Sequence, residues 1–559
     1  MFSVTSFRIA AIAALLVATG VAPTQNTTSP LQSRIKHVFV VFQENHSFDN
    51  YFGTYPGADN LASAAAQSHG FRQFDPIGNS WVTPFRITDP DIESPSQARK
   101  ALAVKMNGGK MDGFVAEQER LAAKKFPGNR AGARAAGLQT MAYYDCDTIP
   151  YLWKYAHTFT LFDRYFEAMT GPSTPGNIAM IAAQAGQTQG ARSPAQLGKP
   201  NDKGQGVPTA NDLDPAYGPS TELYQARQIS QQYATLMLTL TGTNSSQATQ
   251  DTAGVSEDLG AVIAAGHAPV PWGWYQEGYV SPTVATPGYV MHHNAPQYFG
   301  YLRNNDVYWN NVHGTQAMLH ALKNGSLPDR GIFYVKGGTR NQFGWKPANP
   351  DPYVQAQYRG DDDHPGPGDA DAQIAETFVA TFVNAIARSA YWNDSAIIIT
   401  WDDPGGFYDH VPPAGFETCP DGKPCGDGPR VPFILISPYA RSGAVVHDSA
   451  DTASVVKFAE TIFDLPALSS LPDEKPFMPE GPRDGNPAIA DLSGAFDPAR
   501  LNGTVPPIPA SQAEIPDAEV NVFPPRMNCA SLGITPEVLS NAPSTPPPGF
   551  MARVPRKAP

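Results

Sequence analysis

The chain has 559 residues, of which 41% are hydrophobic and 16% are charged, and its formal net charge is −13. This composition is that of a globular protein with a large core, and its 55 prolines predict long irregular connections between elements. The acidic balance excludes nucleic acid as an expected partner, because binding to a phosphate backbone depends on clustered lysine and arginine.

The N-terminus predicts export. Arg8 precedes an apolar stretch from Ile9 to Val21, and small residues end it near Ala22. We interpret residues 1–22 as a cleaved secretory signal peptide, because the stretch is shorter than the roughly 18–20 apolar residues of a membrane anchor. We therefore expect a periplasmic or secreted protein without stable membrane insertion, and contact with lipid head groups stays open.

Short apolar runs and helical patterns alternate along the chain. Four runs predict buried parallel strands, since continuous apolar runs suit a sheet that is covered on both faces: His37–Phe42, Gly331–Gly337, Ser395–Thr400 and Val431–Ser437. Residues 372–392 place Ile374, Phe378, Phe382 and Ile386 on one helical stripe, and residues 452–465 show a similar stripe after a Thr or Ser cap. The alternation predicts an α/β doubly wound fold with long insertions.

Polar side chains follow two of these strands. Glu44 and Asn45 come soon after the first strand, and Asp402 and Asp403 follow Trp401 at the end of the strand Ser395–Thr400. In an open parallel sheet the ligand site lies beyond the carboxyl ends of the strands. Adjacent carboxylates repel unless a cation or donor compensates them, and oxygen ligands suit Ca²⁺, Mg²⁺, Mn²⁺ or iron. We therefore predict that these four residues bind one divalent metal ion.

A hydroxyl lies in a turn before a third helical pattern. Ser173 belongs to the turn Gly171–Pro175, which precedes the helical pattern of residues 177–186. A hydroxyl at a helix N-terminus is most often an N-cap, but the same place favours phosphate binding. If a metal ion contacts Ser173, the pKa of the hydroxyl falls and an alkoxide nucleophile becomes available.

Histidines are candidates for contacts with a phosphoryl group, because imidazoles donate to phosphoryl oxygens and to a leaving alkoxide. His292 and His293 are adjacent, and on a strand at most one of them would face the site. His364 lies among three carboxylates, which would raise its pKa. His410 is a further candidate that could equally fix its own loop.

The cysteines and the less regular segments give further expectations. The four cysteines, Cys146, Cys419, Cys425 and Cys529, predict two disulfides in an oxidising compartment. Cys419 and Cys425 are close enough to clip one loop, which would leave Cys146 for Cys529, but the sequence does not fix the pairing. We interpret the polar residues 187–266 as a lid or cap insertion. Residues 472–559 are rich in proline and predict an extension that is packed on the core or partly disordered.

The motifs together resemble a known family. The stretches "IKHVFVVFQENHSFDNYFGTYPG", "NGGKMDGF", "FDRYFEAMTGPSTPGN", "HHNAPQYF", "DDHPGPGD" and "IIITWDDPGGFYDHVPP" occur in the family's order, from about residue 35 to residue 465. The chain resembles the bacterial phosphoesterases that include acid phosphatase A and the secreted phospholipases C, distant members of the alkaline phosphatase superfamily. The resemblance implies a three-layer α/β/α, alkaline phosphatase-like sheet in a catalytic domain of about residues 33–471.

The resemblance also implies residue roles. The residues that look like the metal ligands are Glu44, Asn45, Asp402 and Asp403, and Ser173 occupies the place of the nucleophile, which also contacts the metal. His292, His293 and His364 match the histidines around the phosphate. Two departures stand out. No histidine shortly precedes "GGKMDGF", so a phosphate-contacting group is missing or is supplied elsewhere, and Gly176 is inserted after the nucleophile turn.

These observations predict an exported, metal-dependent phosphomonoesterase that acts through a phosphoseryl intermediate. The alternative is a phospholipase C that cleaves phosphatidylcholine-type diesters. The phosphomonoesterase is favoured because the family's phospholipases commonly carry additional β-rich C-terminal domains, and because "WDDPGG" resembles the phosphatases. A second alternative, favoured by the absent histidine, is a secreted protein that binds metal or phosphate without catalysis.

Overall fold

The structure is a computed structural model of the whole chain. It describes residues 29–185, 231–242, 254–303, 309–415, 426–474, 482–543 and 545–554, with a few single positions between 209 and 252. The predicted signal peptide, much of the predicted lid segment, and Cys419 and Cys425 lie outside these residues. Within the described ranges, no helix has both the length and the apolar character that crossing a bilayer requires.

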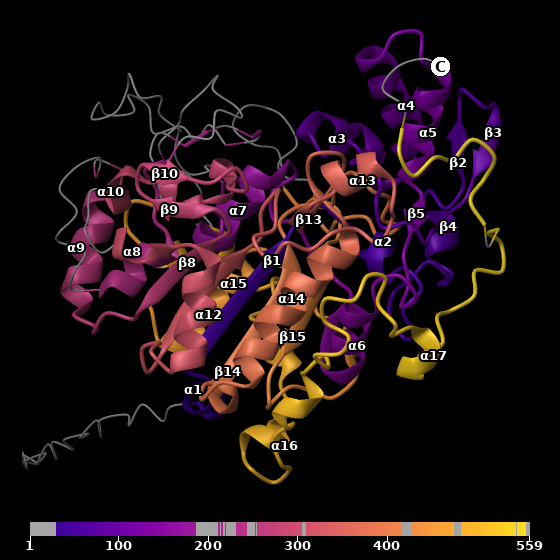
Figure 1. Cartoon of the computed structure of the whole chain (residues 1–559). Helices are drawn as coiled ribbons and strands as arrows, with labels where there is room; N and C mark the ends of the chain where they lie inside the picture. The colour runs from indigo at the N-terminus through magenta and orange to yellow at the C-terminus, as the bar shows by residue number, and fades with distance from the viewer. Residues whose placement is uncertain are drawn as a thin grey trace, which may run out of the picture.

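An eight-stranded sheet forms the centre of the fold (Figure 1), in the order β11-β8-β12-β1-β14-β15-β6-β16. Its strands are β1 (His37–Gln43), β6 (Thr160–Phe162), β8 (Trp272–Gln276), β11 (Val312–His313), β12 (Gly331–Lys336), β14 (Ser395–Trp401), β15 (Phe433–Ile436) and β16 (Ala444–Val446). The prediction of a mostly parallel sheet is confirmed. All seven residues of the central strand β1 are buried, because strands flank it and helices cover it.

One predicted strand runs in the other direction. β15 pairs antiparallel with both β14 and β6, so the prediction that residues 431–437 form a parallel strand is wrong in orientation. The described part of the connection between β14 and β15, residues 402–415 and 426–432, contains no helix. A parallel neighbour needs a crossover that returns the chain to the other end of the sheet, whereas an antiparallel one starts where the previous strand stops.

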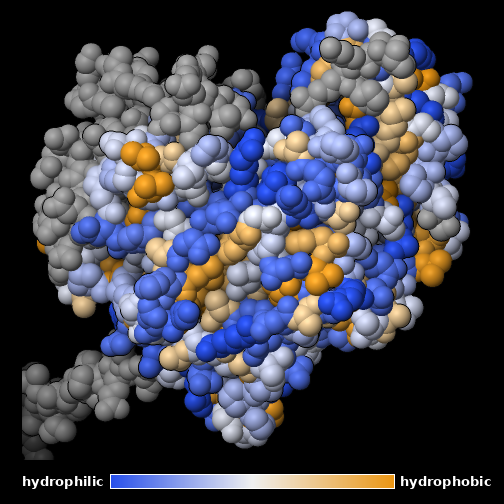
Figure 2. All heavy atoms as spheres, in the orientation of Figure 1, coloured by the Kyte–Doolittle hydropathy of each residue, from blue (hydrophilic) through white to orange (hydrophobic). Residues whose placement is uncertain are grey.

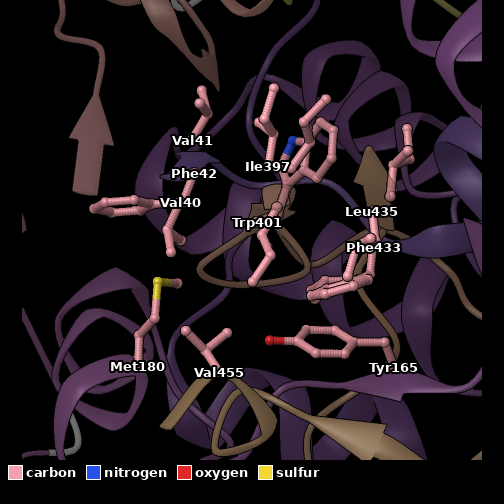
Figure 3. Close-up of a cluster of buried hydrophobic side chains, with 14 of the residues drawn as sticks. Val40, Val41, Phe42, Tyr165, Met180, Ile397, Trp401, Phe433, Leu435 and Val455 are labelled. Carbon is pink, nitrogen blue, oxygen red and sulfur yellow. The ribbon is translucent and has the colours of Figure 1, made fainter. Parts of the chain in front are cut away.

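Helices cover both faces of the sheet and complete the expected three layers (Figure 1). One layer holds α14 (Ala372–Ala387), α12 (Thr315–Asn324) and α6 (Pro150–Thr158), and the other holds α7 (Ser173–Ala182) and α15 (Ser454–Phe463). Figure 3 shows Met180 of α7 and Val455 of α15 facing buried side chains of the central strands. The predicted cap of α15 is wrong: Ala453 holds the N-cap position without a side-chain hydrogen bond.

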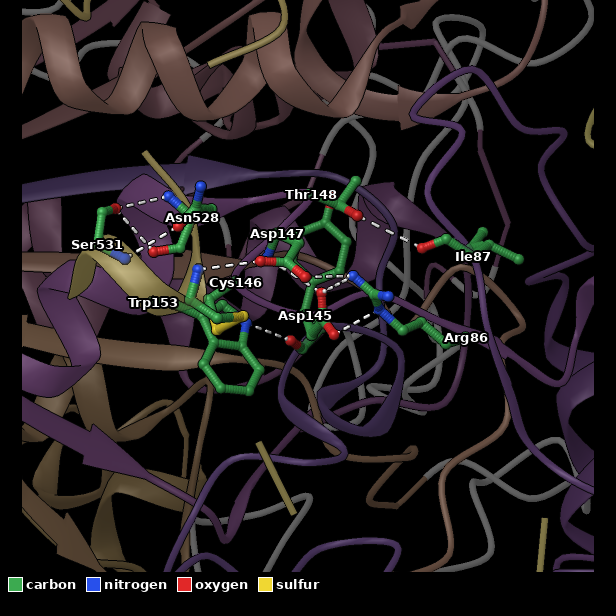
Figure 4. Close-up of a disulfide and its surroundings, with 11 residues drawn as sticks. Arg86, Ile87, Asp145, Cys146, Asp147, Thr148, Trp153, Asn528 and Ser531 are labelled. Carbon is green, nitrogen blue, oxygen red and sulfur yellow. Dashed lines mark hydrogen bonds and ion pairs between the residues drawn. A yellow bond between two sulfur atoms is a disulfide. The ribbon is translucent and has the colours of Figure 1, made fainter. Parts of the chain in front are cut away.

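The described part of the C-terminal extension lies against the core. A disulfide joins Cys146 to Cys529 across a sequence separation of 383 residues (Figure 4). Beside it, the backbone N–H of Cys529 donates to Asp147 Oδ1 at 3.0 Å. Buried apolar residues of this extension, among them Leu492 and Ile515, belong to the same hydrophobic core as the sheet. The extension therefore covers part of the sheet-based core instead of forming a separate one.

Candidate active site

The register of the central strands brings the predicted metal ligands together. Gln43 at the end of β1 pairs with Trp401 at the end of β14, so Glu44 and Asp402 leave the sheet at the same level. The backbone N–H of Asp402 donates to the carbonyl of Gln43 at 3.0 Å. All four predicted ligands are fully buried. The expectation that two separate strand ends supply one cluster thus agrees with the geometry.

Ser173 points into this cluster. Its Oγ lies 2.9 Å from Asp403 Oδ2, 3.2 Å from Glu44 Oε2 and 3.4 Å from the Asn45 side chain. Ser173 is the first residue of α7, the N-cap position is Pro172, and the backbone N–H of Thr174 donates to Asp212 Oδ1 at 3.1 Å and not to Ser173. The N-cap interpretation of Ser173 is therefore wrong, and the hydroxyl faces the carboxylates.

The glycine inserted after the nucleophile turn has a structural reason. A Cβ atom at Gly176 would lie 2.0 Å from the carbonyl oxygen of Asp402, so only glycine lets the first turn of α7 approach this strand end. The next residue, Asn177, donates from Nδ2 to Asp402 Oδ2 at 3.0 Å and to the carbonyl of Ser173 at 2.8 Å. Asn177, which we did not predict, therefore ties Ser173 to Asp402.

The charges in the cluster fit a divalent cation. Burial, with the neighbouring charge of Glu44, raises the pKa of Asp403 to about 8. Burial also raises the pKa of Asp402 well above its ordinary value, against the charge of Lys336. Although burial opposes it, His293 and Lys336 hold the pKa of Glu44 well below its ordinary value. Three crowded carboxylates with a hydroxyl and an amide form an oxygen-rich set of the kind that binds Mg²⁺, Ca²⁺ or Mn²⁺.

The side-chain amide of Asn45 can present either terminal atom to the carboxylates. The atom on that side lies 3.1 Å from Asp403 Oδ2 and 3.3 Å from both Glu44 Oε2 and Asp402 Oδ1. If the amide nitrogen of Asn45 occupies this position, it donates to the carboxylates and both ends of the amide have hydrogen-bond partners. If the amide oxygen occupies it, Glu44, Asn45, Asp402 and Asp403 all direct an oxygen toward the same place. The second orientation is the one that a bound cation would favour, so Asn45 has the reach of a fourth ligand.

The predicted histidines line a pocket of about 670 Å³ that opens over the cluster. His292 and His293 lie on η5 (Met291–His293), a 3-10 turn, with ring centroids 4.3 Å apart. Both line the pocket, because adjacent side chains on a turn do not alternate between two faces as they do on a strand. His293 Nε2 contacts Glu44 Oε1 at 2.7 Å. Burial lowers the pKa of His292 to about 4 and that of His293 to about 3, so both rings are neutral at pH 7.

His364 is the positively charged histidine of the pocket. It lies on β13 (Gly360–Pro365), and its Nδ1 is 3.2 Å from Asp369 Oδ2. Although burial opposes it, this carboxylate raises the pKa of His364 well above its ordinary value. The predicted direction of the shift is confirmed, but the principal partner is Asp369, which lies five residues further along the chain.

Several residues of the site were not predicted. Lys336, the last residue of β12, places its ammonium 3.1 Å from Glu44 Oε1 and 3.0 Å from Asp402 Oδ2. Asp362 lies close to Glu44 and His293. Gln97 lines the pocket from the segment before "GGKMDGF", and its Nε2 lies 3.2 Å from the Asn45 amide. A polar donor from that segment therefore reaches the pocket although no histidine is present there.

His410 does not line the pocket. Its Nδ1 lies 2.7 Å from Asp49 Oδ2 and its Nε2 lies 3.1 Å from Asp59 Oδ1. The ring is fully buried beside the guanidinium of Arg430. Of the two interpretations of His410, the structure favours the one in which it fixes its own loop.

The environment of His410 predicts a pH dependence of stability. Although burial opposes it, the carboxylates of Asp49 and Asp59 raise the pKa of His410 to about 9, from an ordinary value of 6.5. The protonated ring therefore stabilises the fold fully below pH 6.5, and this contribution, about 3 kcal/mol, is lost as the pH rises through 9. We expect His410→Gln to lower the free energy of unfolding in urea at pH 6 and to have little effect at pH 9.5. A difference that does not change with pH would contradict this assignment.

Comparisons with known proteins place the chain in a family. Residues 35–466 match the Phosphoesterase family. The chain therefore belongs to this family, as the ordered motifs led us to expect.

Individual relatives are distant. The chain is 24% identical over 521 residues to a non-hemolytic phospholipase C of Burkholderia pseudomallei, an alignment that covers 86% of this chain and 62% of that protein. It is also 24% identical to phospholipase C A of Mycobacterium tuberculosis, with 83% of this chain and 77% of that one covered. Among solved structures, a protein of the alkaline phosphatase superfamily from Vibrio parahaemolyticus aligns over 78% of this chain and 68% of that one, with 10% identity and a TM-score of 0.29.

Proposed function

We propose that this chain is a metal-dependent phosphoric ester hydrolase that uses Ser173 as its nucleophile and prefers phosphate monoesters to phosphodiesters. The observation that carries the proposal is the position of the Ser173 hydroxyl, within 3.4 Å of three of the four candidate metal ligands in a pocket lined by histidines. A hydroxyl that merely caps a helix or solvates a turn has no reason to face two buried carboxylates and a buried amide.

The proposed reaction has two displacements at phosphorus. Ser173 Oγ forms a bond to phosphorus while the bond to the leaving alcohol breaks, and water then attacks the phosphoserine and releases phosphate. A divalent cation held by Glu44, Asn45, Asp402 and Asp403 would lower the pKa of the Ser173 hydroxyl and neutralise charge on the phosphoryl oxygens. The side-chain amide of Asn177 holds Ser173 in place by donating to the backbone carbonyl oxygen of Ser173.

The histidines have separate proposed tasks. His364 holds a proton at neutral pH beside Asp369, so it can stabilise a phosphoryl oxygen or protonate the leaving alkoxide. His293 orients Glu44 through Nε2, and its Nδ1 finds no hydrogen-bond partner among the described residues, which leaves it open to substrate. His292 and Gln97 offer further donors, and such a set suits a phosphoryl group with three non-bridging oxygens.

Two observations favour phospholipase C as the second candidate. The relatives described above carry that name. In addition, the hairpin of β9 (Tyr279–Ser281) and β10 (Val284–Ala285) lies at the pocket, since Ala285 is part of its lining. Val280 and Val284 on this hairpin are 58% and 51% exposed, and Figure 2 shows an apolar group there on a mainly hydrophilic face. Exposed aliphatic residues beside a phosphate pocket are where an acyl chain would lie.

A comparison of two chromogenic substrates tests the proposal. We expect the purified enzyme, assayed with Mg²⁺, Mn²⁺, Ca²⁺ and Fe²⁺ in turn, to show a kcat/KM at least about tenfold higher on p-nitrophenyl phosphate than on p-nitrophenyl phosphorylcholine. The reverse preference would make phospholipase C the correct assignment. No hydrolysis of either ester with any of the ions would favour a metal- or phosphate-binding protein without catalysis.

A further inference from the structure

Lys336 is a buried cation inside the candidate metal site. It is the last residue of β12, pairs with Phe42 in the neighbouring strand β1, and its side chain is 0% exposed. Its ammonium lies 3.1 Å from Glu44 Oε1 and 3.0 Å from Asp402 Oδ2, and 4.7 Å from the centroid of the Phe42 ring. A buried ammonium needs compensating partners, and here those partners are two carboxylates that are also candidate metal ligands.

The two carboxylates divide their oxygens between two sides. Glu44 Oε2 and Asp402 Oδ1 face the Asn45 amide, and Glu44 Oε2 also contacts Ser173 Oγ at 3.2 Å. Glu44 Oε1 and Asp402 Oδ2 face away from the nucleophile, toward Lys336. The cluster therefore has two positions for positive charge, one at the nucleophile and one behind it.

The rear position also has metal-binding groups. Glu44, His293 and Asp362 are buried, and each places one ligand atom within 4.8 Å of the other two. His293 Nε2 reaches the same Glu44 Oε1 that Lys336 contacts, at 2.7 Å. Two carboxylates and an imidazole form a donor set of the kind that binds Zn²⁺ or Mn²⁺. The ammonium of Lys336 contacts Glu44 Oε1, which belongs to this set, and also Asp402 Oδ2.

We propose that Lys336 is a built-in cation that takes the place of a second metal ion, so that the centre binds one ion and the orientation of Glu44 and Asp402 is fixed before that ion arrives. The charge balance agrees, because one divalent ion and one ammonium neutralise the three carboxylates Glu44, Asp402 and Asp403. A second divalent ion at the rear position would meet the ammonium at contact distance and be repelled. This inference rests on the metal-dependent function proposed above and makes Lys336 a positioning residue.

The metal content of variants tests the inference independently of hydrolysis. Purified full-length protein is stripped of metal, loaded with excess Mn²⁺ or Zn²⁺, desalted and measured by inductively coupled plasma mass spectrometry and by calorimetric titration. We expect one ion per chain in the wild type, two in Lys336→Ala, and one again in Lys336→Arg, which keeps the positive charge. The rescue by arginine separates the role of the charge from a loss of packing.

A second buried lysine gives a matched control. Lys105 Nζ is buried and contacts the carbonyl oxygens of Ser96 at 2.8 Å and Gly406 at 2.9 Å and the side-chain oxygen of Gln118 at 3.2 Å, and among the described residues it contacts no carboxylate. We expect Lys105→Ala to bind one ion. Two ions in the wild type, or one ion with unchanged affinity in Lys336→Ala, would overturn the inference while leaving the hydrolase proposal intact. If Lys336→Ala does not fold, Lys336→Met, which keeps most of the side-chain volume without the charge, takes its place in the same measurement. A wild type that binds no ion would remove both proposals.

Discussion

Replacement of Ser173 by alanine is expected to lower kcat on p-nitrophenyl phosphate by roughly 10³–10⁵-fold, because it removes the proposed nucleophile while leaving the rest of the pocket in place. Ser173 is only 2% exposed and contacts the carboxylates through Oγ alone, so the loss of its hydroxyl opens little space. We therefore expect the thermal unfolding curve of Ser173→Ala to shift by a few degrees at most. Steady-state kinetics at saturating substrate is the measurement.

The adjacent hydroxyl provides the control. Thr174 Oγ1 bonds to Asp212 Oδ1 at 3.1 Å and does not reach the candidate metal ligands, so Thr174→Ala should lower kcat by less than about tenfold. Rapid quenching of the wild type with ³²P-labelled substrate should yield a phosphopeptide that contains Ser173 and is absent from Ser173→Ala. An unchanged rate in Ser173→Ala, or a phosphopeptide from another region, would show that Ser173 is not the nucleophile.

Much of the active centre was accessible from the sequence because it lies at strand ends. Apolar runs marked β1 and β14, and the polar residues directly after them could only lie at the carboxyl edge of a parallel sheet. The ends of β1 and β14 lie side by side because the two strands are neighbours in the sheet, and no local sequence pattern encodes the order of strands. The pairing of Gln43 with Trp401 supplies this missing step.

Other residues were not predictable because their local patterns are ordinary. Lys336 ends an apolar strand and resembles a solvent-facing terminus, but β12 lies beside β1, so its ammonium is buried against Glu44. Gln97 precedes its helix in an irregular segment and reaches the pocket only through tertiary packing. Two adjacent histidines do not distinguish a strand, on which at most one of His292 and His293 would face the site, from the 3-10 turn that lets both line the pocket. The local sequence pattern does not predict where any of these side chains lies in the folded protein.

The second large effect is expected from Arg430, which joins the two chain segments that carry the candidate metal ligands. Its guanidinium is fully buried and lies 2.9 Å from Asp409 Oδ1 and 2.9 Å from Asp49 Oδ1. It also donates to the carbonyl oxygens of Asp59 and Asp163 at 2.8 and 2.7 Å. Arg430→Met should lower the free energy of unfolding by about 3–5 kcal/mol, because it leaves two buried carboxylates without their shared cation. Urea denaturation at pH 7 measures the loss.

An exposed arginine with a similar number of ion pairs is the matched control. Arg388 contacts Glu514 and Asp517, and its side chain is 43% exposed. Arg388→Met should cost less than about 1 kcal/mol, since water already screens both pairs. Equal losses in Arg388→Met and Arg430→Met would mean that the buried network contributes no more than surface pairs do.

Arg430 should also influence the metal site without touching it. Asp49 lies on α2 (Phe48–Phe52), just after Glu44 and Asn45, and Asp409 follows Asp403 by six residues. Arg430 therefore clamps the two ligand-bearing segments to each other on the side away from the pocket. Under conditions where Arg430→Met remains folded, we expect its affinity for Mn²⁺ to fall by about tenfold or more, because the four ligands are no longer held in register before the ion binds. Arg388→Met should bind Mn²⁺ as the wild type does, and an equally tight Arg430→Met would show that the sheet alone fixes the ligands.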